Sequence, residues 1–283
     1  MPLAKVSDML REARKEKRCV AAFNCSNFET IKTVINAGEK LGSPVIVMLY
    51  PTMRSHIPMT TFAAITKDLA EKSAQPVGLH FDHCDDFDLI MEAVRAGFQS
   101  VIVDASRHEF QMNADITRRV AEAAHPLGVD VEAEIGFVGA GNVESDYTDA
   151  AKYTEPEEAE KFAEYTGVDS LAVAIGNAHG HYMVEPKLDI DCLRAINELV
   201  SLPLVLHGGS GIPDAQIKEA IKNGVAKANF GTDYLKAAYN GHSEYILSKD
   251  ERKNIFGMLK AGEDGGASFA ENRILALQNN YLS

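Results

Sequence analysis

The chain has 283 residues, of which 46% are hydrophobic and 24% are charged, as is ordinary for a globular protein with a sizeable core. Its formal net charge of −13 argues against a nucleic-acid partner, because binding to a phosphate backbone needs a basic surface. A small phosphorylated ligand is compatible with an acidic protein, since one local group of backbone N–H donors can hold a phosphate.

Nothing in the sequence predicts contact with a membrane. No stretch approaches the roughly 20 apolar residues of a membrane span, and residues 1–8 lack the apolar core of a signal peptide. The four cysteines are scattered, and no pair has C-x-x-C spacing. Free thiols in a reducing compartment are the simplest interpretation, so we expect a cytoplasmic protein.

Short apolar runs rich in β-branched residues recur along the chain. Such runs are typical of strands that are buried on both faces, as in a parallel sheet. In chain order they are Cys19–Phe23, Pro44–Met48, Val77–Phe81, Ser100–Val103, Asp130–Ala133, Ser170–Ile175, Pro203–Leu206 and Ala226–Phe230.

Segments with a helical pattern alternate with these runs, and several of them end at a glycine, a common helix terminator. They include Phe87–Ala96, Asn113–Leu127, Glu157–Thr166, Asp191–Val200 and Asp214–Asn223. Eight strands alternating with helices over about 250 residues predict an α/β fold of the closed (β/α)₈ type, a TIM barrel. An open doubly wound sheet is the alternative, but the glycine fingerprint expected after its first strand is missing.

No low-complexity linker or charge block divides the chain. We therefore predict a single barrel domain over residues 1–283, in which residues 241–283 form a helical C-terminal extension. Within that extension Arg273 is a candidate for reaching the distal phosphate of a substrate, with a plain surface position as the alternative.

Polar side chains follow nearly every predicted strand, at the end where barrels carry their catalytic groups. Three of the nine histidines, His83, His179 and His207, follow separate strands. Three imidazoles with an open fourth position form a ligand set suited to catalytic zinc. The alternative for any one histidine is a structural polar residue.

Two glycine-containing loops follow the last two strands. They are His207-Gly-Gly-Ser-Gly-Ile-Pro213 and Asn229-Phe-Gly-Thr232. Glycines let the backbone approach a ligand closely, and barrels commonly bind phosphate at these two loops. Tight turns that simply need glycine are the alternative interpretation.

In this order, the motifs resemble those of the class II fructose-bisphosphate and tagatose-bisphosphate aldolases over roughly residues 1–240. The segments that carry the resemblance are Ala22-Phe-Asn24, His80-Phe-Asp-His83, Val103-Asp-Ala-Ser106, Val131-Glu-Ala-Glu-Ile-Gly136, Tyr153-Thr-Glu-Pro-Glu-Glu158, Gly167–Gly176, Ala178-His-Gly180, Leu204–Gly211 and Lys227-Ala-Asn229.

The resemblance implies reversible cleavage of a ketose 1,6-bisphosphate into dihydroxyacetone phosphate and an aldehyde such as glyceraldehyde 3-phosphate. It implies one Zn²⁺ per chain on His83, His179 and His207, with Asp82 moving the proton of the C4 hydroxyl. Asn24 would be a further substrate contact, and a monovalent cation, Na⁺ or K⁺, would lie near the phosphate. The residues implied around that phosphate are Gly180, Gly208, Gly209, Ser210, Asn229 and Thr232.

The loop after Glu134 departs from the family pattern, because it is shortened to Gly139–Asp146. Glu144 is the candidate for the loop carboxylate that moves a proton on the dihydroxyacetone phosphate fragment, and Asp146 is the second candidate. Glu134 or Glu132 would be next, and a solvated loop acid is the alternative.

Other departures bear on the substrate and the metal. The second strand ends at Tyr50, where relatives often have a small hydroxyl residue, and Gly231 stands where many have an acid. Cys84 directly follows a ligand position and is a candidate fourth, soft ligand.

Several functions fit these motifs. The leading hypothesis is the metal-dependent aldolase, which we expect to form a homodimer or homotetramer. The same chemistry could act on a different phosphorylated ketose, or serve an isomerase or epimerase. A non-catalytic partner subunit of a tagatose-bisphosphate aldolase is a further alternative, although a structural subunit would have no need for Asp82 and the three histidines.

Overall fold

Eight parallel strands close into a barrel in the computed structural model, which describes residues 3–249 and 252–278. The strands pair in the order β1 to β8, and β8 pairs with β1. Their bounds are β1 (Val20–Asn24), β2 (Val45–Leu49), β3 (Val77–Cys84), β4 (Ser100–Val103), β5 (Asp130–Ile135), β6 (Ser170–Val173), β7 (Leu204–Leu206) and β8 (Val225–Phe230). The predicted (β/α)₈ fold is confirmed, with strand ends shifted by up to three residues.

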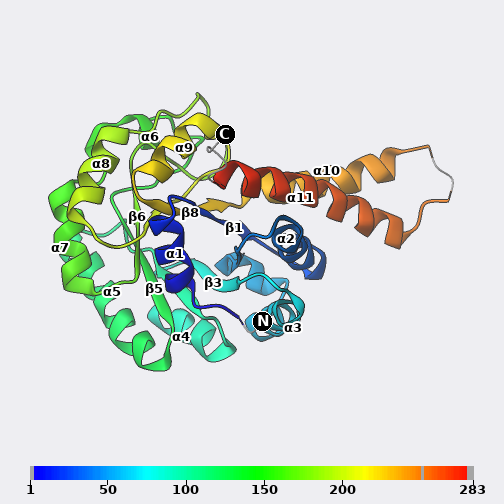
Figure 1. Ribbon diagram of the computed structural model, residues 1–283, viewed down its shortest axis with the longest axis horizontal. Helices are drawn as coiled ribbons and strands as arrows, with labels where there is room; N and C mark the ends of the chain where they lie inside the picture. Colours follow the sequence, from blue (N-terminus) through cyan, green and yellow to red (C-terminus); the bar gives the residue numbers. More distant parts are fainter. Residues whose placement is uncertain (1–2, 250–251, 279–283) are drawn as a thin grey trace.

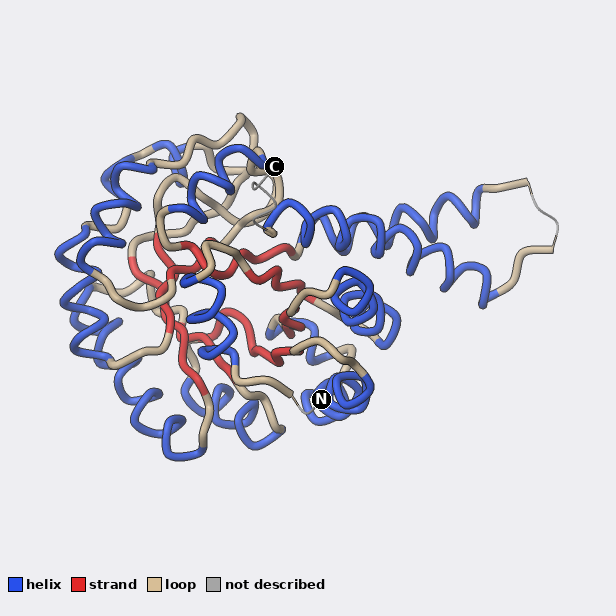
Figure 2. Tube along the Cα trace, in the orientation of Figure 1, coloured by secondary structure: helices blue, strands red, loops and turns tan. Residues whose placement is uncertain are grey.

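Helices surround the strands, which lie at the centre of the barrel in Figure 2. They are α2 (Phe28–Leu41), α3 (Met59–Lys72), α4 (Phe87–Ala96), α5 (Phe110–Ala124), α7 (Pro156–Thr166), α8 (Ile190–Leu199) and α9 (Asp214–Lys222). Short helices lie in the connections, namely η1 (Pro51–Ser55), η2 (His125–Leu127), α6 (Ser145–Thr148) and η3 (Ala150–Lys152). Alternate strand residues such as Val131, Ala133 and Ile135 pack outward into the core beneath the helices.

Helix α1 (Val6–Lys15) packs against the interior of the barrel, away from the strand ends that carry the site. Its Val6, Met9 and Leu10 form one buried cluster with strand residues, including Ile46 and Met48. A buried Asp130 at the start of β5 accepts hydrogen bonds from the backbone N–H and hydroxyl of Ser7, at 2.7 and 3.0 Å. Helix α1 therefore closes the amino-terminal end of the barrel interior.

Two long helices, α10 (Thr232–Leu247) and α11 (Ile255–Leu277), form a hairpin that projects from the barrel (Figure 1). The C-terminal part of α11 returns to the barrel, where Ala270, Ile274 and Leu277 join the main core. The extension predicted from residue 241 thus begins earlier, because α10 follows β8 directly. Residues 250–251 and 279–283 of the predicted extension lie outside the described residues.

Among the described residues, no helix combines the length and the apolar character that a membrane crossing requires.

Candidate metal centre and active site

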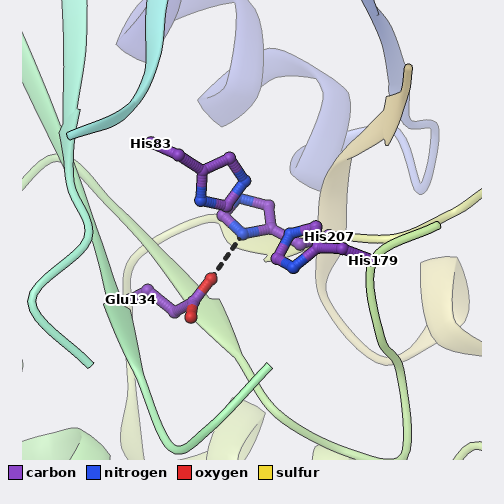
Figure 3. A group of neighbouring side chains, drawn as sticks. All are labelled: His83, Glu134, His179 and His207. Carbon is purple, nitrogen blue, oxygen red and sulfur yellow. Dashed lines mark hydrogen bonds and ion pairs between the residues drawn. The ribbon is translucent and has the colours of Figure 1, made fainter. Parts of the chain in front are cut away.

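Three histidines from separate parts of the chain meet at the carboxyl end of the barrel (Figure 3). The ring of His83 lies 4.5 Å from that of His179 and 4.6 Å from that of His207, measured between centroids. Glu134 joins them, and one potential ligand atom from each of the four residues lies within 4.8 Å of the others. These four residues could therefore hold a single metal ion.

His83 is placed by an irregularity at the end of β3. The pairing of β3 with β4 shifts register between Phe81 and Cys84, and His83 has a φ of +37°, which is uncommon for a residue other than glycine. Such backbone strain persists where the surroundings hold it, often at functional sites. His83 Nδ1 lies 2.8 Å from Asp104 Oδ2, which leaves Nε2 as the nitrogen able to bind a metal.

His179 is held by backbone contacts between two loops. Its N–H donates to the carbonyl of Gly139 and its carbonyl accepts from the N–H of Gly141, at 2.8 and 2.7 Å. Burial, with smaller effects of His83 and His207, lowers the pKa of His179 to about 3, so its ring is neutral. His179 Nε2 is buried and has no hydrogen-bond partner within the described part of the chain. An orphaned imidazole nitrogen among other ligands fits a metal site.

His207 follows β7 and is fully buried between two glutamates of β5. Its Nδ1 lies 2.7 Å from Glu134 Oε2 and its Nε2 lies 2.9 Å from Glu132 Oε1. Burial lowers the pKa of His207, but the two carboxylates outweigh it and raise that pKa to about 10. A metal ion bound by His207 would displace the proton that the two carboxylates stabilise on its ring.

The charge of the buried groups also fits a cation. Asp82, Glu132 and Glu134 are buried, and Asp104 beside them is mostly so. Among the described residues, the buried ammonium group that faces them is Lys227, whose Nζ contacts both oxygens of Glu132 at 2.8 and 2.9 Å. Unpaired buried charge is costly. A divalent cation would offset the excess of carboxylates.

Sequence reasoning did not assign Glu134 to the metal site, although a signal was present. Glu132 and Glu134 are two residues apart in a buried strand, so both point into the barrel.

Cys84, the predicted alternative ligand, is not part of the cluster, and its Sγ contacts the carbonyl of Asp86 at 3.7 Å. Its pKa is raised to about 11, chiefly by burial, which disfavours the thiolate that metals bind.

A pocket of about 580 Å³ opens above the cluster. Of the predicted site residues, those that line it are Asn24, Asp82, His83, His179, Gly180, Gly208, Ser210, Asn229 and Thr232. Gly209, His207 and Glu144 are not among them, and the N–H of Gly209 donates to the carbonyl of Asn229 at 3.0 Å.

Asp82 lies in the pocket wall between two asparagines. Asn24 Nδ2 donates to Asp82 Oδ2 at 2.7 Å, and Asn229 Nδ2 donates to Oδ1 at 3.4 Å. Burial raises the pKa of Asp82, but the positive charges nearby, above all His83, lower it overall. Asp82 is thus an oriented carboxylate that is ready to accept a proton.

The loops after β7 and β8 form the other wall. Gly208 has a φ of +63°, and a Cβ there would collide with the carbonyl oxygen of Ala178. Ser210 accepts from the N–H of Asp233 at 3.4 Å, and Thr232 is the first residue of α10. A helix N-terminus beside a glycine loop favours an anion.

The missing acid at Gly231 has a structural explanation. A Cβ at Gly231 would lie 2.6 Å from Asn24 Oδ1, so the asparagine that orients Asp82 occupies the space of a larger side chain.

The loop acids differ in their surroundings. Glu144 is exposed, precedes α6 and does not line the pocket. Asp146 lines it, but its carboxylate contacts Lys152 Nζ at 2.7 Å and the N–H of Ala140 at 3.0 Å. In this conformation Asp146 holds the loop, and the proton-transfer role of Glu144 stays a prediction.

The known proteins that this chain is similar to point to one family. The model of class II fructose-bisphosphate aldolase matches residues 4–280. The chain belongs to the class II fructose-bisphosphate aldolase family. The protein YdjI of Escherichia coli K12 is 39% identical over 236 residues, which are 83% of this chain and 85% of YdjI.

Solved structures agree with this class II aldolase assignment. The crystal structure of the YdjI aldolase superposes with a TM-score of 0.88 at 33% identity, covering 99% of this chain and 98% of that one. The structure of a candidate fructose-1,6-bisphosphate aldolase from Coccidioides immitis gives a TM-score of 0.86 at 28% identity and covers 96% of both chains. The family is metal-dependent, and the His/Glu cluster is where this aldolase would hold the ion.

The metal assignment can be tested one ligand at a time. We predict that His83→Ala, His179→Ala and His207→Ala each lose the bound metal, because two imidazoles hold zinc weakly in an open site. Elemental analysis after dialysis measures this, and the exposed His56, changed to alanine, serves as the control that keeps its metal. Full occupancy in all three variants would contradict the assignment.

Proposed function

We propose that this protein is a zinc-dependent aldolase that cleaves a ketose 1,6-bisphosphate, of the fructose or tagatose type, to dihydroxyacetone phosphate and an aldehyde such as glyceraldehyde 3-phosphate. The observation that carries the proposal is the oriented carboxylate of Asp82 beside the histidine cluster. When bound, the metal supplies positive charge that stabilises the negative charge developing on the dihydroxyacetone phosphate fragment.

The residues of the chain have distinct tasks in this proposal. Asp82 accepts the proton of the C4 hydroxyl as the bond between C3 and C4 breaks, and returns it in the reverse direction. Asn24 keeps Asp82 in place. Among the described residues nothing donates to the buried Asn229 Oδ1, so it can accept a hydrogen bond from a substrate hydroxyl. Gly180, Gly208, Ser210 and Thr232 surround the phosphate, with Na⁺ or K⁺ nearby.

The alternatives differ in their demands on the site. A non-catalytic partner subunit would not need a strained histidine and an oriented buried carboxylate, which the chain retains at a cost in stability. An epimerase or isomerase could use the same cluster but would release no triose phosphate. A different phosphorylated ketose is compatible with the same machinery.

The reaction is tested by offering phosphorylated ketoses and detecting dihydroxyacetone phosphate, with and without a chelator. We expect release that the chelator abolishes and the metal restores. Asp82→Asn should lower turnover by about 10²–10⁴-fold with metal content unchanged, whereas Asp85→Asn, an exposed neighbour, should have little effect. Chelator-resistant cleavage, or normal turnover in Asp82→Asn, would contradict the mechanism.

The loop acid is tested by hydrogen exchange at C3 of dihydroxyacetone phosphate alone. We predict that Glu144→Gln slows this exchange sharply and leaves thermal stability unchanged, because the side chain is exposed and the loop can close over the substrate. Asp146→Asn should lower stability more, since it loses the contact with Lys152. A larger loss of exchange in Asp146→Asn, with stability kept, would transfer the role to Asp146.

We further propose that the chain forms a homodimer or homotetramer through the α10–α11 hairpin. Leu247, the last residue of α10, is 82% exposed and Phe256, the second residue of α11, is 80% exposed, with Ile246 and Ile255 beside them in sequence. Apolar side chains on a projecting element favour burial against a second copy.

The free thiols of the four cysteines are compatible with the proposed cytoplasmic location.

Sedimentation velocity tests the assembly. The double variant Leu247→Ser, Phe256→Ser is predicted to sediment as a smaller species than the wild type. Met112→Ser, which changes a 53% exposed residue on α5, is the control and should keep the wild-type mass. A monomeric wild type, or an unchanged mass in the double variant, would overturn this proposal.

A further inference from the structure

The loops that carry His179 and His207 touch each other beside the metal centre. Gly208 follows His207 directly, and a Cβ at Gly208 would collide with the carbonyl oxygen of Ala178, the residue before His179. The backbones of the two loops are therefore in contact one residue away from each histidine. A side chain that ties these two backbones together also fixes the separation of the two imidazoles.

The hydroxyl of Tyr182 makes such a link. It accepts a hydrogen bond from the N–H of Ala178 at 2.8 Å and donates one to the carbonyl of Gly208 at 2.9 Å. Burial raises the pKa of Tyr182 above its usual value, so the hydroxyl keeps the proton that it donates. One hydroxyl thus joins the backbone next to His179 to the backbone next to His207.

The ring of Tyr182 packs against two further loops. A Cβ at Gly211, in the loop after β7, would lie 3.1 Å from Cδ2 of the ring, so the ring lies close against that loop. The ring of Tyr147, between β5 and α7, lies 4.9 Å away in an edge-to-face arrangement. Tyr147 is 1% exposed, and its hydroxyl accepts from the N–H groups of Met183 and Val184, at 3.2 and 3.1 Å. The hydroxyl of Tyr182 is therefore held in a fixed position.

A second side chain of the loop after β6 supports the link. Asn177 is buried, its Nδ2 donates to the carbonyl of His207 at 3.1 Å, and its Oδ1 accepts from the N–H of Ile175 at 2.9 Å. The loop after β6 thus holds the carbonyls of two successive residues, His207 and Gly208. Neither Tyr182 nor Asn177 lines the pocket. Their contacts act on the histidine loops and not on a substrate.

We propose that Tyr182 is a positioning residue that fixes the spacing of His179 and His207, and so determines how tightly the centre binds Zn²⁺. A site binds tightly when its ligands are in place before the ion enters, because ordering them on binding costs free energy. Without the hydroxyl, the N–H of Ala178 and the carbonyl of Gly208 would lose this partner, and the two loops would be free to move apart. This inference rests on the metal centre of the proposed function.

The test is the affinity of the folded protein for Zn²⁺, measured without substrate by competition with a chromophoric chelator. Tyr182→Phe removes the hydroxyl and keeps the ring. It should weaken Zn²⁺ binding by about 10- to 100-fold, the range for partners that orient metal ligands. Circular dichroism of the metal-free variant checks that it is folded.

Tyr153→Phe is the matched control. The hydroxyl of Tyr153 donates to the carbonyl of Tyr147 at 2.9 Å, so it belongs to the same group of tyrosines but does not bond to the backbone beside a histidine. Each variant loses a hydroxyl and both should melt at a lower temperature, whereas Tyr153→Phe should keep the wild-type affinity for Zn²⁺. Unchanged affinity in Tyr182→Phe, or an equal loss of affinity in Tyr153→Phe, would overturn the inference.

The wild-type measurement separates this inference from the function on which it rests. A wild type that binds no Zn²⁺, or that binds it equally well after His179→Ala, would contradict the metal centre itself. Tight binding that His179→Ala abolishes, together with unchanged affinity in Tyr182→Phe, would contradict only the role of Tyr182.

Discussion

The ring of His207 is held between two buried glutamates, and the rest of the site depends on that arrangement. Neither glutamate can be buried as an anion without compensation. Glu132 is compensated by Lys227, whereas the partners of the Glu134 carboxylate among the described residues are the hydroxyl of Ser106, at 2.8 Å, and His207 itself. The pKa of Glu134 is raised, first by burial and then by Asp104, which expresses the same excess of negative charge. A divalent cation among the histidines would offset that excess.

The barrel places this charge where water and substrate can reach it. At the amino-terminal side the interior is packed by α1, with Val20 and Ala22 of β1 pointing inward. Two residues further along the same strand, Asn24 reaches the pocket. The alternation of strand side chains thus carries β1 from a closed apolar layer to an open polar one.

Much of this could be predicted from the sequence, because it follows from periodicity. Eight apolar runs separated by helical patterns predict the barrel, and the residues that follow them predict which histidines meet. Glu134 could have been assigned as well, since two acids two residues apart in a buried strand must share the interior. The fit of Asn24 into the space above Gly231 could not, because it depends on contact between residues some 200 positions apart. Nor could the positive φ of His83, which no local sequence rule requires.

X-ray absorption at the zinc edge, on protein loaded with one equivalent of Zn²⁺, tests the central claim most directly. The account predicts three imidazole nitrogens with the remaining ligands oxygen, and loss of an oxygen ligand or of tight binding in Glu134→Gln. A sulfur ligand, which only a cysteine such as Cys84 or a methionine could supply, would contradict it, as would fewer than three imidazoles around the metal.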